Sequence, residues 1–133
     1  LGRTLKKVNK IVKDIKQIGY SAVKGEKLNY ENLKNEISVT DILVNCTSLG
    51  MFPHIHQNPV PPELLTPQLI VYDIVYNPLN TQLIKNAKKK GCLVIDGLGM
   101  LLYQAIASFK IWTGQTPPVE PLRKVALKQL IKK

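Results

Sequence analysis

An arginine, a threonine and a lysine near the start of the chain form a pattern that favours binding of an anion. Arg3, Thr4 and Lys7 fall within residues 2–7 (GRTLKK), which lead directly into a predicted helix. Backbone N–H groups and the helix dipole attract negative charge at a helix N-terminus, and side-chain cations add to that attraction. In dinucleotide-binding folds an arginine at this place accommodates a ribose 2′-phosphate. The alternative is a solvated helix end without a ligand.

Three further clusters of glycine and polar residues follow short apolar runs, at residues 45–51 (NCTSLGM), 72–78 (YDIVYNP) and 96–104 (DGLGMLLYQ). Ligands of doubly wound α/β domains bind at the carboxyl ends of the strands, and glycine lets a backbone approach a ligand closely. The candidates for ligand contact are Thr47, Tyr76, Gly97 and Gln104. The alternatives are an ordinary polar turn around Thr47, packing of Tyr76 on the rim of the sheet, and a hydrogen-bonded amide of Gln104 in the core.

The hydrophobic pattern predicts the elements that must position these clusters. Continuous apolar runs predict strands at residues 41–46, 69–74 and 92–95, with a weaker strand at 21–24. Periodic or capped segments predict helices at residues 5–18, 29–37, 80–90, 100–112 and 119–131. The two glycines at 97 and 99 are expected just before a helix, where the bare backbone would suit a stacked ring.

Short strands that are apolar throughout, with helices between them, are typical of a parallel sheet covered on both faces. The predicted fold class is therefore α/β, a doubly wound parallel sheet flanked by helices. The length of 133 residues indicates one domain.

The composition indicates a globular protein without a membrane partner. The chain is 44% hydrophobic and 21% charged, and no apolar run approaches the roughly 20 residues of a membrane span. Cys46 and Cys92 lie in apolar runs without metal-ligand spacing, so we expect both to be reduced and buried, as suits the cytoplasm. His54 and His56 lack a third ligand nearby, which predicts exposed side chains and no metal site.

The net charge of +10 leaves a basic nucleic-acid-binding module as an alternative. The lysines are scattered and lack interleaved aromatic residues, which favours solvated helix faces and no nucleic-acid partner. A gel shift that weakens steeply with salt would support the alternative.

Taken together and in order, the four clusters resemble the shikimate dehydrogenase family. That family carries an NRTxxR-like stretch, an NATSxGM-like turn, a YDxxYNPxxTxLL segment, and DGxGMLxxQ followed by AFxxWTG. The corresponding segments here are residues 2–7, 45–51, 72–84 and 96–114, the last reading DGLGMLLYQAIASFKIWTG. The resemblance covers nearly the whole chain, and quinate/shikimate dehydrogenases share most of it.

The resemblance implies that residues 1–133 are a Rossmann-like NADP-binding domain without its first strand, its glycine-rich turn and the N-terminal substrate domain. The implied reaction is the reversible NADPH-dependent reduction of 3-dehydroshikimate to shikimate, in chorismate and aromatic amino acid biosynthesis. No catalytic residue is expected here, because the family's Lys–Asp pair lies outside the chain. The implied cofactor contacts are Gly2, Arg3, Thr4, Lys7, Thr47, Ile74, Gly97 and Met100, and the implied substrate contacts are Tyr76 and Gln104.

Two departures and two alternatives accompany the resemblance. Gly2 replaces the family's asparagine, and Lys7 replaces an arginine by a point charge, which weakens phosphate binding. A quinate/shikimate dehydrogenase that uses NAD or NADP is one alternative, and a non-catalytic remnant is the other. Residues 1–133 alone are expected to be inactive. Their incomplete sheet is expected to self-associate or to rearrange the first 37 residues.

Overall fold

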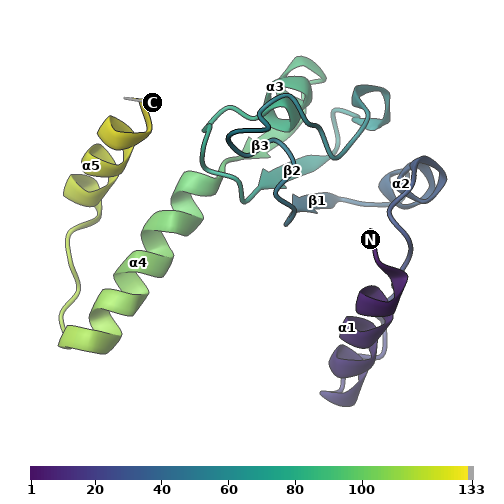
Figure 1. The fold of residues 1–133 in the computed structure, drawn as a ribbon, viewed down its shortest axis with the longest axis horizontal. Helices are drawn as coiled ribbons and strands as arrows, with labels where there is room; N and C mark the ends of the chain where they lie inside the picture. Colours follow the sequence, from purple (N-terminus) through teal and green to yellow (C-terminus); the bar gives the residue numbers. More distant parts are fainter. Residues whose placement is uncertain (132–133) are drawn as a thin grey trace. The chain divides into compact units, whose positions relative to one another are not determined.

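A computed structural model describes residues 1–131, and the chain divides into two compact units (Figure 1). The first unit comprises residues 1–40 and the second begins at Asp41. The boundary precedes the first strand of a parallel sheet. The residues that line the groove described below lie between Cys46 and Met100, so they all belong to the second unit.

The first unit is built on the amphipathic helix α1 (Leu5–Gln17), as the periodicity predicts. The segment after Gly19 runs back along this helix, so closely that a Cβ on Gly25 would lie 2.6 Å from the side chains of Val8 and Val12. The predicted strand at residues 21–24 is wrong. The unit's β pairing is a single bridge between Gly2 and Lys27, and residues 21–24 have no neighbouring strand in the described chain.

Helix α2 (Tyr30–Ile37) completes the first unit. Asn29 caps it, since its side chain accepts a hydrogen bond of 2.8 Å from the Asn32 N–H. Leu33 and Ile37 are buried on its inner face.

The second unit contains a parallel sheet of three strands in the order β1 (Ile42–Asn45), β2 (Ile70–Asp73) and β3 (Leu93–Ile95). Helix α3 (Gln82–Lys89) connects β2 to β3, packs on both and buries Leu83, Ile84 and Ala87. The connection from β1 to β2 carries a short 3₁₀ helix, η1 (Pro62–Leu64). These elements confirm the α/β class with a parallel sheet.

The two faces of the sheet differ in burial. Val71 and Asp73 of β2 are 0% exposed on the face that α3 covers. On the opposite face Ile70 and Tyr72 of β2 are half-buried, and the flanking strands expose large apolar residues, namely Ile42, Val44, Leu93 and Ile95. The prediction that apolar strands imply cover on both faces is therefore wrong for this face. Strand β1 pairs with β2 on one side, and no described strand pairs with its other edge.

Helix α4 (Gly97–Thr113) follows β3, and α5 (Val119–Ile131) packs beside it (Figure 1). Asp96 caps α4 by accepting a hydrogen bond of 3.0 Å from the Leu98 N–H. The helix therefore begins at residue 97 instead of the predicted 100. The expectation of glycines before the helix is wrong, since Gly97 and Gly99 lie in its first turn. Gly114 ends α4 in the left-handed conformation, with φ 73°.

Candidate functional site

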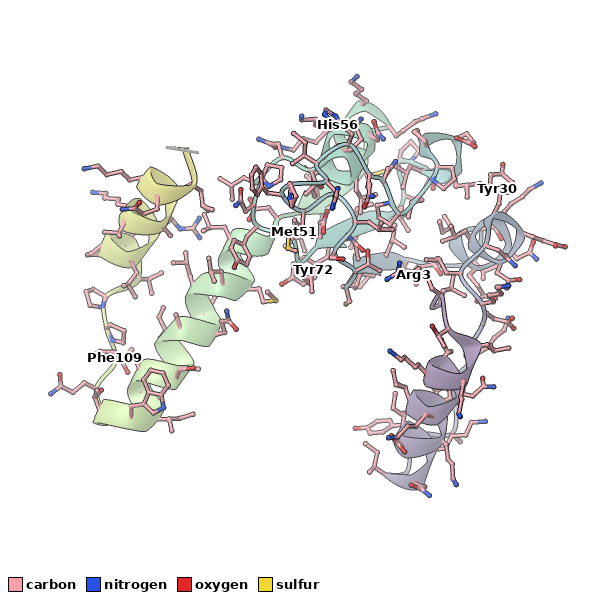
Figure 2. The ribbon with its side chains drawn as sticks, in the orientation of Figure 1. Arg3, Tyr30, Met51, His56, Tyr72 and Phe109 are labelled. Atoms are coloured by element: carbon pink, nitrogen blue, oxygen red, sulfur yellow. The ribbon has the colours of Figure 1, made fainter. Side chains whose placement is uncertain are left out.

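A groove of about 370 Å³ lies at the carboxyl ends of β1 and β2, beside the first turn of α4. This is the place at which parallel α/β sheets bind ligands. Four predicted residues line it, namely Thr47, Ile74, Tyr76 and Met100. The other lining residues are Cys46, Ser48, Met51, Phe52, Val75 and Asn77, and Figure 2 labels Met51 among them.

The turn after β1 forms one wall of the groove. The buried Asn45 side chain accepts hydrogen bonds from the Thr47 N–H and hydroxyl, at 3.0 and 2.7 Å. The Thr47 hydroxyl in turn accepts from the Leu49 N–H. Gly50 turns the chain with φ 86°, and a Cβ there would lie 3.2 Å from the Gln57 carbonyl oxygen. The glycine of this motif is therefore required by the turn itself.

The turn after β2 forms the second wall. Its first residues are held by hydrogen bonds from the Ile74 N–H to the Asn45 carbonyl and from the Val75 N–H to the Asp73 carboxylate. The Phe52 N–H donates to the Asn77 carbonyl at 2.9 Å, which joins the rims of the two walls. Tyr76 lines the groove and is 37% exposed, so its side chain is accessible to a ligand.

Gly97 lies behind the second wall and is not among the residues that line the groove. It is buried, and a Cβ at this position would clash with the Ile74 carbonyl group and would lie 2.7 Å from the Val75 carbonyl oxygen. The first turn of α4 can approach residues 74 and 75 only because position 97 has no side chain. Packing of the chain therefore requires this glycine, and Met100, three residues further along α4, reaches the groove.

Gln104 lies one helical turn beyond Met100 on α4. Its side chain is exposed and does not line the groove. The alternative of a core amide is therefore wrong.

The basic cluster of the first unit surrounds the N-terminus of α1, and Figure 2 shows Arg3 at this end of the helix. Arg3, Thr4 and Lys7 are exposed, and the first turn contains no acidic residue. The Thr4 side chain makes no capping hydrogen bond, so its hydroxyl is available to a ligand. Gly2 is half-buried, and a Cβ there would lie 2.6 Å from a Val8 methyl group.

The two cysteines differ, although the apolar runs around them predict burial for both. Cys46 is exposed on the groove, so the prediction is wrong for this residue. Cys92 is buried, and its thiol donates to the Thr66 carbonyl oxygen at 3.1 Å. Burial raises the pKa of the Cys92 thiol.

His54 and His56 are exposed, as predicted. Within residues 1–131, no three histidine, cysteine or acidic residues form a group that could hold a metal ion. No helix in the same part of the chain combines the length and apolar character needed to cross a membrane.

Residues 97–127 match the family model described as Shikimate 5′-dehydrogenase C-terminal domain. The shikimate dehydrogenase (NADP⁺) of Pyrococcus abyssi is 45% identical over 123 residues, which cover 92% of this chain and 45% of that protein. A crystal structure of a shikimate dehydrogenase in complex with NADP⁺ is 34% identical with a TM-score of 0.87, and covers 96% of this chain and 45% of that one. Quinate dehydrogenase from Corynebacterium glutamicum in complex with NAD is 30% identical with a TM-score of 0.84, covering 93% and 43%.

The chain spans less than half of the length of the relatives that it matches. Within that span, the similarity extends over the parallel sheet, the two turns that form the groove and helix α4. These similarities show that the chain belongs to the shikimate dehydrogenase family.

Proposed function

We propose that the protein containing this chain catalyses the reversible NADPH-dependent reduction of 3-dehydroshikimate to shikimate, a step of chorismate and aromatic amino acid biosynthesis. The main support is the groove at the carboxyl ends of β1 and β2, lined by Thr47, Ile74, Tyr76 and Met100. The second support is the similarity to shikimate dehydrogenases over more than nine-tenths of the chain.

The chemistry of the first unit fits a cofactor that carries a 2′-phosphate. Arg3 and Lys7 offer cationic donors, Thr4 offers a free hydroxyl, and the N-terminus of α1 adds backbone donors. The absence of an acidic residue from the first turn favours a phosphate over a free ribose hydroxyl. We assign the 2′-phosphate to this cluster, with Gly2 as a backbone neighbour.

The groove of the second unit fits the nicotinamide end of the cofactor and the substrate. Bound NADPH would supply the hydride that reduces the substrate carbonyl. Thr47, Ile74 and Met100 would pack against the cofactor, with Gly97 holding α4 close behind them. The Tyr76 hydroxyl would contact the substrate from the groove, and Gln104 would do so from the exposed face of α4.

We assign the binding of cofactor and substrate to this chain, and acid–base catalysis to the rest of the protein. We propose that residues 1–133 correspond to the NADP-binding domain after its first strand and its glycine-rich turn, and that a separate substrate domain carries the catalytic Lys–Asp pair. The lengths of the relatives support this assignment, since the chain covers 45% of the Pyrococcus abyssi enzyme.

Steady-state kinetics of the full-length protein test the proposal. Shikimate should drive the formation of NADPH from NADP⁺, followed by its absorbance, and 3-dehydroshikimate should consume NADPH. Residues 1–133 purified alone should give no shikimate-dependent NADPH. A full-length, folded protein without either activity would exclude the function and favour a non-catalytic remnant.

The alternative function is that of a quinate/shikimate dehydrogenase that uses NAD or NADP. The observation in its favour is the similarity to a quinate dehydrogenase bound to NAD, with a TM-score of 0.84. Comparison of kcat/KM for shikimate and quinate with each cofactor separates the two functions. The basic cluster at α1 predicts that NADP is preferred whichever acid is oxidised.

A further inference from the structure

Asp73 is a fully buried carboxylate at the carboxyl end of β2, and it does not line the groove. It lies between Asn45 at the end of β1 and Thr81 at the N-terminus of α3. Burial of a carboxylate costs free energy unless hydrogen bonds compensate it, so the partners of Asp73 indicate what the group does.

Three groups donate hydrogen bonds to Asp73. The Thr81 hydroxyl donates to Oδ2 at 2.6 Å, while the Asn45 amide and the Val75 N–H donate to Oδ1 at 2.9 and 3.1 Å. The ion pairs among the described residues involve Lys24 and not Asp73. Among the described residues, the donors to Asp73 are therefore all neutral. Asn45 and Val75 belong to the walls of the groove, and Thr81 belongs to the N-terminus of α3.

The bonds have a fixed direction that reaches both walls of the groove. Because Asp73 accepts from the Asn45 NH₂ group, Asn45 must present its carbonyl oxygen to Thr47, whose N–H and hydroxyl both donate to it. The same carboxylate oxygen holds the Val75 N–H and so fixes the turn that carries Tyr76. Oδ1 of Asp73 is thus linked by hydrogen bonds to the turn after β1, through Asn45, and to the turn after β2, through Val75.

We propose that Asp73 is the positioning residue of this site, which holds the Thr47 turn and the Tyr76 turn at the separation that receives the nicotinamide and the substrate. The proposal rests on the proposed function. Asp73 acts through Asn45 and Val75 and touches neither ligand. The bond from Thr81 serves a different purpose, since the Thr81 hydroxyl also accepts from the Ile84 N–H and caps α3.

The network offers two variants that separate these roles. Asp73→Ala removes the hydrogen bonds that Asp73 accepts from Asn45 and Val75, together with the one from Thr81. Thr81→Val removes the hydrogen bond from Thr81 to Asp73 and the cap of α3, but it leaves the bonds from Asn45 and Val75 intact. It is therefore the matched control for loss of stability. Asp73→Asn keeps one carbonyl oxygen that can still accept from Asn45 and Val75, and it serves as the conservative variant.

Amide hydrogen exchange measures the positioning independently of any activity. In Asp73→Ala the Thr47 and Val75 amides should lose at least about tenfold in protection, while the Val71 amide in the core of β2 stays protected. In Thr81→Val the Thr47 and Val75 amides should stay within about threefold of the parent. Equal loss at Thr47, Val75 and Val71 would mean general unfolding and would overturn the positioning role.

Steady-state kinetics of the full-length protein, well below the Tm of each variant, measure the consequence. Asp73→Ala should lower kcat/KM for shikimate by at least about tenfold, Asp73→Asn by less, and Thr81→Val by less than about twofold despite a lower Tm. Unchanged kcat/KM in Asp73→Ala, or an equal loss in Thr81→Val, would overturn the proposal.

If Asp73→Ala does not fold, Asn45→Ala cuts the link to Thr47 and should give the same pattern. An inactive parent would instead exclude the proposed function, and hydrogen exchange would still test the network.

Discussion

Arg3 is the residue on which the choice between NADP and NAD should depend. It is exposed at the N-terminus of α1 beside Thr4, whose hydroxyl has no capping role. A charge-assisted contact to phosphate is lost in Arg3→Ala, so we expect NADP to bind roughly tenfold to a hundredfold more weakly while NAD binding is unchanged. Titration of the full-length protein with each cofactor measures the effect.

Lys10→Ala is the matched control for Arg3→Ala. Lys10 is exposed on α1 beyond the first turn, so its removal changes the net charge equally without removing a phosphate contact. An equal loss of affinity for NADP and NAD in Arg3→Ala would show that Arg3 does not bind the 2′-phosphate.

Tyr76 and Gln104 are expected to affect the substrate more than the cofactor. Tyr76→Phe removes the hydroxyl of a side chain that lines the groove, and Gln104→Ala removes an exposed amide one turn beyond Met100. Both variants should lower kcat/KM for shikimate while the affinity for NADP stays near that of the parent. Tyr103 is an exposed tyrosine of α4, so Tyr103→Phe should change neither kcat/KM for shikimate nor the affinity for NADP. If kcat/KM for shikimate is unaffected in both variants, neither side chain binds the substrate.

The exposure of the two cysteines predicts an order of chemical modification. Cys46 should react first with iodoacetamide because it is exposed on the groove, whereas Cys92 is buried and donates to a carbonyl oxygen. The raised pKa of Cys92 also means that its thiolate forms only at a higher pH than that of an ordinary thiol. Mass spectrometry of the alkylated chain gives the order. Modification of Cys92 before Cys46 in the folded chain would contradict the structure.

The residue types identify the place of the site but not the contacts of each residue. Thr47, Ile74, Tyr76 and Met100 lie on the groove because each follows a strand end or lies in the first helical turn beyond one, and their ligand contacts stay predictions. The ligand contact of Gly97 stays a prediction, and the structure adds that its backbone lies against the Ile74 and Val75 carbonyl groups. A sequence reveals that a position needs glycine and does not reveal which atom requires it.

At the scale of the elements, hydrophobic periodicity predicts α1, α2, α3, β1, β2 and β3 to within a few residues. It fails for residues 21–24, since a strand needs a hydrogen-bonded neighbour that local sequence does not specify. The early start of α4 depends on the Asp96 cap, whereas the apolar pattern of this helix begins only at Met100. The sequence does not predict the buried Asp73 network, although an aspartate at the end of an apolar strand is a signal of it.

Two glycines in the first turn of α4 should respond oppositely to the same substitution. Gly97→Ala would place a Cβ against the Ile74 and Val75 backbone, so the helix or the second wall must shift and the Tm should fall. Gly99 has open space around its Cβ position, so Gly99→Ala should raise stability by up to about 1 kcal/mol through helix propensity. Thermal unfolding of both variants measures the contrast. Equal Tm changes of the same sign would contradict the close approach at Gly97.

At the scale of the whole chain, the strands β1, β2 and β3 lie in sequence order, as one half of a doubly wound sheet does. Such a sheet changes strand order beside the first strand of that half, and β1 has no described partner on that edge. The groove lies at the end of the same strand. An apolar strand edge next to an exposed apolar face is a template for association with another chain.

Residues 1–133 purified alone should therefore self-associate through the exposed face of the sheet. Ile42, Val44, Leu93 and Ile95 are 45–63% exposed on that face, and burial of such side chains stabilises association. Val44→Lys introduces a charge on the edge strand and should shift the chain toward the monomer. Val39→Lys makes the same change at a position that is 80% exposed but outside the sheet, and it should associate like the parent. Sedimentation velocity over a range of concentrations measures both. A parent that stays monomeric at high concentration, or two lysine variants that behave alike, would show that the sheet face does not drive association.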